Sequence, residues 1–302
     1  MAELLQLRTD MTFEYGVARQ MAPGIRRLIA PNPSALTFHG TNTYLLGDED
    51  DVTVIDPGPD VPSHLQAILN ASHGRISNIL LTHTHHDHMA GLDALKTLTG
   101  AKTHGFDASA APRGRTQNSP SNSEFVDHNF SPDIKLHDGD HIKLSGSSLS
   151  VHHTPGHAPD HLCFLLHDQR VFFSGDHVMG WNTSVVAPPE GNMGDYIRSL
   201  EKLLEIQADV YFPGHGGQIQ NPRRFVKAYL LHRKMRDASI LECIQSGVST
   251  VVEIRESLYP RIDDAVLRAA ELSVFAHVEY LIERELVRAD GPVSLNASFL
   301  PA

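Results

Sequence analysis

The chain has 302 residues, of which 41% are hydrophobic and 20% are charged, and its formal net charge is −11. This length suits one large globular domain followed by a smaller one. No apolar run approaches the length needed to cross a bilayer, so we expect no membrane association. The negative charge repels phosphate at long range, which argues against a protein that binds nucleic acid by charge alone.

The first residues and the cysteines indicate a compartment. Residues 1–10 lack a basic region followed by an apolar stretch and a cleavage site, so we expect no secretion signal. The two cysteines, Cys163 and Cys243, cannot form a disulfide framework. Cys163 lies within the apolar run 162–166, where we expect a buried and unreactive thiol. The prediction is a cytoplasmic protein with no obligate protein partner.

A cluster of histidines follows an apolar strand pattern. Residues 78–82 form a short, β-branched run that predicts a strand. If the chain stays extended beyond it, His83 and His85 point the same way, because side chains alternate along a strand. Asp87 and His88 are adjacent and cannot share that direction. We therefore expect a turn after His85 that directs them to a second position.

The same arrangement recurs three times after a helix expected over residues 90–98. In each case a strand pattern ends at a glycine that directly precedes a histidine or an aspartate. The strand patterns cover residues 149–153, 170–173 and 209–212, and the side chains that follow are His157, Asp176 and His215. Ligands gathered at strand ends are held rigidly, as a preorganised site requires. Neighbouring histidines that do not fit the pattern are expected to be structural: His86, His152, His153 and His177.

These motifs supply five imidazoles and two carboxylates: His83, His85, Asp87, His88, His157, Asp176 and His215. Such a set can hold two divalent metal ions about one bridging oxygen apart. Nitrogen and oxygen donors favour Zn²⁺ and tolerate Mn²⁺ or Fe²⁺. Two cations lower the pKa of a shared water, and the resulting bridging hydroxide attacks a carbonyl or phosphorus centre. Asp87 could accept a proton in that reaction, so we predict a metal-dependent hydrolase with Asp87 as a catalytic residue.

The motifs resemble the metallo-β-lactamase superfamily. Its signature His-x-His-x-Asp-His is present as His83 to His88, and the resemblance covers roughly residues 20–220. It implies an α+β fold, the four-layer αβ/βα metallo-β-lactamase sandwich. By the scheme of the family, the first metal is bound by His83, His85 and His157, the second by Asp87, His88 and His215, and Asp176 bridges the two.

The resemblance also implies roles for residues around the metals. Asp56 matches an upstream aspartate that orients a ligand histidine without binding the metal itself. Asn42 could offer its amide to the substrate, although turn chemistry explains the segment around it nearly as well. Independently of the resemblance, His161 lies four residues beyond His157 and either faces the substrate or is a structural histidine.

A smaller, helical region is expected after residue 220. Asn221 and Pro222 are typical of a helix start. The expected elements are helices over residues 222–236, 249–259 and 263–286 and a wing-like tail over 286–295. They resemble the winged-helix appendage of the two-domain β-lactamase-like proteins, the branch that includes the endoribonuclease β-lactamase-like protein two. The predicted domains are residues 1–220, catalytic, and 221–302, winged-helix-like.

Two segments bear on the substrate. Residues 105–133 are rich in proline, serine, asparagine and glycine, and we expect a loop over the site that is either a lid or a plain solvated insertion. The helix over 222–236 carries six basic side chains. Such a face is usually solvated, but it allows a shallow groove for single-stranded RNA.

Features that this sequence lacks narrow the choice of subclass within the superfamily. The commonest metallo-β-lactamases carry cysteine where Asp176 stands, so we expect no antibiotic substrate. Only 18 residues separate His157 from Asp176, which leaves no room for the inserted cap domain of the related nucleases. Hydroxyacylglutathione hydrolases share the seven ligands, but their basic C-terminal pattern is not visible here.

Three classes of function remain open. The first is a dinuclear hydrolase, either a phosphodiesterase that acts on single-stranded RNA like an endoribonuclease, or a hydroxyacylglutathione-type hydrolase of a small ester or thioester. The second is a mononuclear iron oxidoreductase similar to the persulfide dioxygenases. The third is a winged-helix binding protein with a relic metal site. Metal analysis with a substrate panel would discriminate between them.

Overall fold

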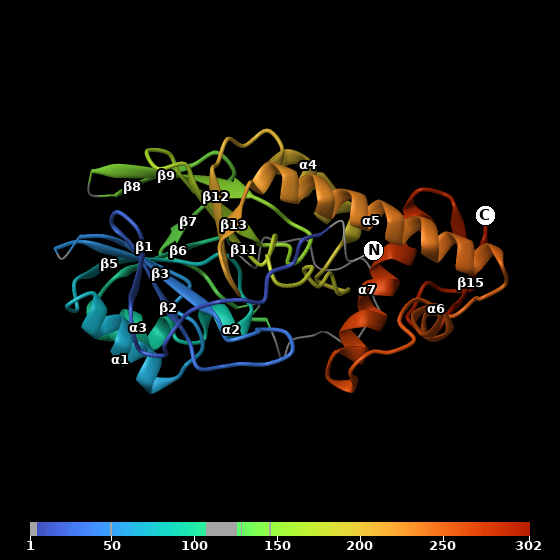
Figure 1. Cartoon of the computed structure of the whole chain (residues 1–302), viewed down its shortest axis with the longest axis horizontal. Helices are drawn as coiled ribbons and strands as arrows, with labels where there is room; N and C mark the ends of the chain where they lie inside the picture. Colours follow the sequence, from blue (N-terminus) through green and yellow to red (C-terminus); the bar gives the residue numbers. More distant parts are fainter. Residues whose placement is uncertain (1–4, 49, 107–125, 128, 145) are drawn as a thin grey trace.

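The structure is a computed structural model of the whole chain, and it describes residues 5–48, 50–106, 126–127, 129–144 and 146–302. Most of the loop expected over residues 105–133 lies outside the described residues. Two β-sheets pack face to face, and helices cover the outer face of each sheet (Figure 1). The predicted four-layer αβ/βα sandwich is therefore confirmed.

The first sheet contains seven strands in the order β1-β2-β3-β4-β5-β6-β7. Their bounds are Arg19–Ala22, Ile25–Ile29, Asn42–Gly47, Val52–Ile55, Ile76–Leu80, Lys102–Gly105 and Ile134–Lys135. Neighbours are antiparallel up to β4, and β4 to β7 run parallel. Because parallel strands end at the same edge, the segments after β4 and β5 meet: the backbone N–H of Asp56 donates to the Leu80 oxygen at 2.9 Å.

The second sheet contains six strands in the order β13-β12-β11-β10-β9-β8. From β8 to β13 their bounds are His141–Leu144, Ser147–His153, Leu162–Leu166, Val171–Gly175, Val210–Pro213 and Ile219–Gln220. Only β11 and β12 are parallel among these described pairs. This pairing brings two turns together, since the N–H of Gly214 donates to the Gly175 oxygen at 2.8 Å. Those turns carry Asp176 and His215.

Three apolar layers stabilise the sandwich. Phe164, Phe173 and Phe212 are buried between the two sheets, and burying one such side chain contributes about 1.5–3 kcal/mol. A second layer joins the first sheet to its helices, and a third joins the second sheet to helices on the other side. The helices are α1 (Pro62–Ala71) and α3 (Leu92–Thr99) on the first sheet, and α4 (Met193–Leu203) and α5 (Pro222–Gln245) on the second.

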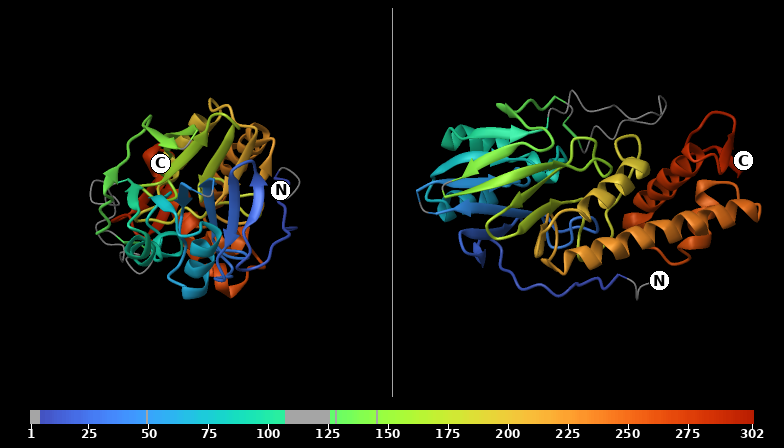
Figure 2. Two further views of the ribbon diagram at one scale, coloured as in Figure 1. Left: turned by 90° about the vertical axis from the view of Figure 1, so that its left-hand side faces the viewer. Right: turned by 90° about the horizontal axis from the view of Figure 1, so that it is seen from above.

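The C-terminal region contains three helices and a two-stranded antiparallel sheet, in the order expected from the sequence. After α5 come α6 (Val251–Leu258), α7 (Asp264–Glu283), β14 (Val287–Asp290) and β15 (Ser298–Pro301). Helix α5 extends nine residues beyond the predicted end at Arg236, because Ile240 and Ile244 continue its buried stripe into a separate apolar core. Its first half packs on the second sheet instead. One long helix thus belongs to both cores, and Figure 2 shows it extending away from the sandwich.

Among the described helices, none has the length and apolarity that crossing a bilayer requires. Cys163 is fully buried as expected, and burial raises the pKa of its thiol to about 12. Both cysteines are free.

Candidate metal centre

The candidate ligands lie on short segments that follow the strands. Strand β5 ends at Leu80, two residues earlier than predicted, because the N–H and the hydroxyl of Thr82 bond to the Asp56 carboxylate at 2.8 and 2.7 Å instead of extending the strand. The turn expected after His85 is a one-turn helix, α2 (His86–Met89). It separates the directions of His85 and His88, as the sequence predicts.

The first group of donors contains His83, His85 and His157. The His83 Nε2 and His85 Nδ1 atoms are 2.8 Å apart, so these two side chains point the same way, as expected. The His157 Nε2 atom lies 3.0 Å from the same His85 nitrogen, although 72 residues separate them in the chain.

The second group contains Asp87, His88 and His215. One oxygen of Asp87 lies 3.1 Å from His215 Nε2 and 3.4 Å from His88 Nε2. The two imidazole nitrogens are 3.3 Å apart. These three residues come from α2 and from the turn after β12.

Asp176 lies between the two groups. Its Oδ2 atom is 3.3 Å from His215 Nε2 and 3.8 Å from His157 Nε2, and its Oδ1 atom is 3.5 Å from His88 Nε2. The Oδ1 atom is buried and has no hydrogen-bond partner among the residues that the structure describes. A carboxylate in this position can contact a ligand of each group at once.

The donor atoms fit divalent metal ions. Ligand atoms around a tetrahedral Zn²⁺ with bonds of about 2.0–2.1 Å lie about 3.4 Å apart. The contacts within the two groups range from 2.8 Å to 3.4 Å, and all three donors of each group lie within 4.8 Å of one another. Both groups could therefore hold a cation, with Asp176 beside each.

The outer nitrogen of most of these imidazoles is fixed by the protein. The Nδ1 atoms of His157 and His215 donate to the backbone oxygens of Val185 and Gly40 at 2.6 and 3.2 Å. The Nδ1 atom of His88 lies 2.9 Å from Asp56 Oδ2. Such bonds set the tautomer and the direction of the inner nitrogen, as is common for metal-bound histidine.

Electrostatics differ between the groups. Burial holds the pKa of His83 well below its usual range and lowers that of His85 to about 3, because desolvation disfavours a charged imidazole. For His215, burial acts in the same direction, but the Asp176 carboxylate outweighs it and raises the pKa to about 9. His83 and His85 thus present neutral imidazoles, whereas the carboxylates attract positive charge to the second group.

Asp56 has the supporting position that the resemblance implies. It is 2% exposed, and its oxygens contact Thr82 and His88. Its φ angle is +52°, a conformation that non-glycine residues rarely adopt and that persists only where the surroundings enforce it.

Replacing Asp56 with asparagine is expected to weaken metal binding by about tenfold to a hundredfold, because the amide no longer offers His88 a charged partner. Competition with a chromophoric chelator measures the affinity. The control is Asp60→Asn, at an exposed carboxylate four residues away, which should leave the affinity unchanged. Equal affinities for the Asp56 variant and the original protein would contradict this role.

Two expected substrate contacts are not supported. His161 is fully buried: its Nδ1 atom lies 2.9 Å from the Thr154 hydroxyl, and its Nε2 atom accepts from the Asp176 N–H at 3.1 Å. Asn42 is also fully buried, and its amide nitrogen donates to the oxygens of Pro213 and Gly216 at 2.9 Å each. Both side chains support the ligand turns from behind, and neither is exposed on the surface.

Some supporting groups escape sequence reasoning. Asp160 is buried and accepts from the Thr84 N–H at 3.0 Å, which fixes the backbone between His83 and His85; its position three residues after His157 is the available signal. No such sequence signal marks Gly40 and Val185, whose backbone carbonyls accept from His215 and His157. Gly214 is required by space, because a Cβ atom there would lie 2.3 Å from Asp176 Oδ1.

The long helix α5 reaches the ligand segment. Arg233 is buried and donates to the Ser184 oxygen, next to the Val185 carbonyl that fixes His157. The Tyr229 hydroxyl bonds to Met179 in the same segment.

The basic face expected on α5 is smaller than its sequence suggests, because Arg233 and Arg236 are both buried. The exposed basic side chains of α5 include Arg223, Arg224 and Lys227.

The chain is similar to known proteins over most of its length. The family model described as Metallo-beta-lactamase superfamily matches residues 36–215. A Beta-lactamase-like protein 2 homolog of Drosophila melanogaster is 37% identical over 230 residues, 74% of each chain. An Atrochrysone carboxyl ACP thioesterase of Aspergillus fumigatus is 30% identical over 257 residues, 80% of this chain and 75% of that protein.

Solved structures share the fold. A metallo-beta-lactamase family protein from Thermus thermophilus superimposes with a TM-score of 0.77 at 25% identity, covering 94% of this chain and 100% of that one. A Beta-lactamase domain protein from Burkholderia ambifaria has a TM-score of 0.81 at 21% identity, covering 100% and 98%. The shared architecture therefore includes the C-terminal helices.

Proposed function

Since the chain belongs to the metallo-β-lactamase superfamily, we propose that it is a hydrolase whose seven described side chains bind two divalent metal ions, Zn²⁺ first among them. The observation that carries the proposal is the position of Asp176, within 3.3 to 3.8 Å of histidines from both donor groups. When bound, two such cations polarise an electrophile and acidify a water into the physiological pH range.

The residues of the chain provide position and proton transfer. Asp87 is the most exposed of the carboxylates, with 29% of its side chain accessible against 9% for Asp176. The substrate therefore approaches from the side of Asp87 and His85, which is also partly exposed. Asp87 is the group placed to accept a proton there. The buried ligands fix the positions of the donor atoms. They are Asp176, His83, His88 and His215.

The first candidate substrate is a phosphodiester of single-stranded RNA. Three cations in the first half of α5, Arg223, Arg224 and Lys227, are exposed and available to phosphate. The C-terminal helices and the hairpin β14–β15 are proposed to be a winged-helix-like unit that begins with residue 221. A cytoplasmic location belongs to the same proposal.

The second candidate substrate is a thioester. Its support is the relative named as an Atrochrysone carboxyl ACP thioesterase, 30% identical over 80% of this chain. Thioester and phosphodiester hydrolysis make the same demand on the metal centre, which is stabilisation of negative charge on an oxygen as bonds change. The residues around the metals therefore do not separate the two.

A substrate panel with metal analysis tests the proposal. The purified chain is expected to carry two equivalents of zinc and to hydrolyse either a single-stranded RNA or an acyl thioester of a pantetheine carrier. A chain with two metals that cleaves no ester, thioester or phosphodiester would contradict it. One equivalent of iron with oxygen uptake would replace it by an oxidoreductase, and nucleic-acid binding without metal would replace it by a binding protein.

A further inference from the structure

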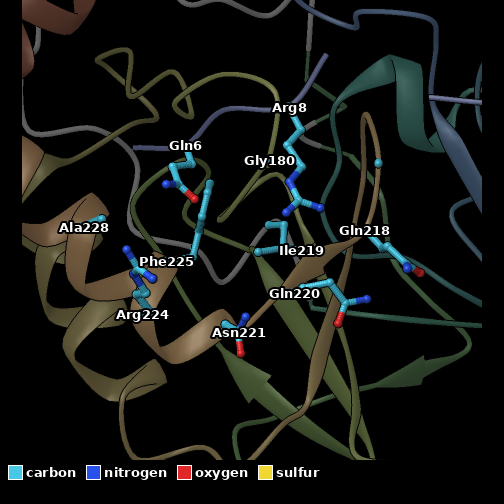
Figure 3. Close-up of a pocket in the computed structure, with 11 residues that line it drawn as sticks. Gln6, Arg8, Gly180, Gln218, Ile219, Gln220, Asn221, Arg224, Phe225 and Ala228 are labelled. Carbon is cyan, nitrogen blue, oxygen red and sulfur yellow. The ribbon is translucent and has the colours of Figure 1, made fainter. Parts of the chain in front are cut away.

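A second polar pocket lies beside the candidate metal centre. It has a volume of about 90 Å³ and is lined by residues of the N-terminal segment, of the turn after His215 and of the start of α5 (Figure 3). Figure 3 shows Arg8 and Arg224 on opposite sides of it, with the side chains of Gln6 and Gln220 also around it. None of the seven candidate metal ligands lines this pocket.

The pocket is positive in an acidic protein. Among the described residues that line it, none is acidic, whereas the chain as a whole carries a net charge of −11. Arg8 and Arg224 are both exposed, and neither forms an ion pair with an acidic side chain of the described part of the chain. Two unpaired guanidinium groups beside amide side chains attract an anion and can bind it through several N–H donors.

The backbone that carries the two arginines is fixed. Leu5 is 4% exposed and belongs to the apolar core beside α4 and α5. The N–H of Arg8 donates to the Gly180 oxygen at 2.9 Å, so the N-terminal segment is held alongside α5 (Figure 2). Arg224 lies in the first turn of a helix of 24 residues. The pocket is therefore formed before a ligand arrives, which lowers the entropy cost of binding.

The pocket is close to the ligand turns. Gly217 lines it and follows His215 by two residues, so their Cα atoms are separated by at most about 7 Å. Gly180 also lines it and follows Asp176 by four residues. Trp181 follows Gly180 in the chain, its ring lies against Gly216, and it stacks on Phe38 with ring centroids 4.8 Å apart. Both aromatic side chains are partly exposed.

We propose that this pocket binds a phosphate group of a nucleotide that forms part of the substrate, and this rests on the proposed hydrolytic function of the neighbouring centre. A pocket of about 90 Å³ with a guanidinium group on either side suits a single phosphate group. The rest of the nucleotide extends along the Trp181 and Phe38 rings, which offer a face for stacking. The nucleotide belongs either to RNA or to a coenzyme A thioester.

Calorimetric titration of the full, zinc-loaded chain tests the pocket without turnover. The probes are adenosine, adenosine 5′-monophosphate, coenzyme A with a free thiol, and a short single-stranded DNA. The monophosphate is expected to bind at least tenfold more tightly than adenosine. The double variant Arg8→Gln/Arg224→Gln should lose that tenfold advantage, because it removes both charges and keeps the polarity of the side chains.

Matched controls separate this pocket from other phosphate sites. Arg261→Gln removes an exposed charge that does not line the pocket, and it should bind the monophosphate within twofold of the original protein. Arg8→Lys/Arg224→Lys should restore part of the affinity. Coenzyme A and the oligonucleotide are then compared, and tighter binding of either one supports the pocket. The probe that binds more tightly shows whether the phosphate belongs to a coenzyme A thioester or to a nucleic acid.

Two results overturn the inference. One is equal binding of adenosine and its monophosphate. The other is a double variant that keeps the phosphate preference, since the phosphate would then bind at the metals. Turnover of a small phosphodiester and of a small thioester, neither of which carries a nucleotide, is measured separately with the original protein. If both turnovers are absent while the arginine-dependent preference persists, the pocket stands and the proposed hydrolysis fails.

Discussion

Replacing Asp176 with alanine is expected to lower kcat/KM for the identified substrate by at least about a thousandfold, since a two-metal site depends on both cations for nucleophile and charge stabilisation. Asp176 contacts histidines of both groups, so its loss affects both metals. Replacing His85 should have a comparable effect through the first group. Steady-state kinetics and metal content are the measurements.

The matched control for these variants is His86→Ala. His86 lies inside the same histidine motif, yet it is exposed and belongs to neither donor group. This variant should keep its metal content and its kcat/KM within about twofold. Full activity of the Asp176 variant, in a preparation free of contaminating enzyme, would refute the assignment of the site.

Removing the metals is expected to have the second large effect. Three carboxylates, those of Asp56, Asp87 and Asp176, surround His88, and without cations protons on His88 and His215 are needed to offset their mutual repulsion. A ligand that binds only the native state at a thousand times its Kd stabilises it by about 4 kcal/mol. Dialysis against a chelator should therefore abolish activity and lower the Tm.

Restoring Zn²⁺ should recover both activity and Tm, while Mg²⁺ should recover little, because imidazole donors suit zinc better. The Asp176→Ala variant is the control, since its Tm should respond much less to the chelator. A chelated chain with unchanged Tm and activity would contradict a metal-dependent site.

The sandwich is implied by the family resemblance, whereas the proximity of the candidate ligands follows from local sequence patterns. Strand ends followed by glycine place His157, Asp176 and His215 at one edge, and the alternation of His83 and His85 predicts their shared direction. The three C-terminal helices are predicted from apolar side chains at helical spacing. The end of α5 is not, since its last two turns depend on a core formed with α6 and α7.

Roles that depend on long-range contacts could not be predicted. His161 and Asn42 lie next to ligand motifs in the chain, but their side chains turn inward to support those motifs. The carbonyls of Val185 and Gly40 belong to segments with no sequence signal. The pocket between Arg8 and Arg224 joins residues more than 200 positions apart, and only the packed structure brings them together.

Anomalous X-ray scattering at the zinc absorption edge, on crystals of the full chain grown with zinc, is the decisive test of the two-metal assignment. Two peaks about 3.5–4 Å apart are predicted, one next to His83, His85 and His157 and the other next to Asp87, His88 and His215, with the Asp176 carboxylate in contact with both. A single peak, or peaks away from these side chains, would show that the assignment is wrong.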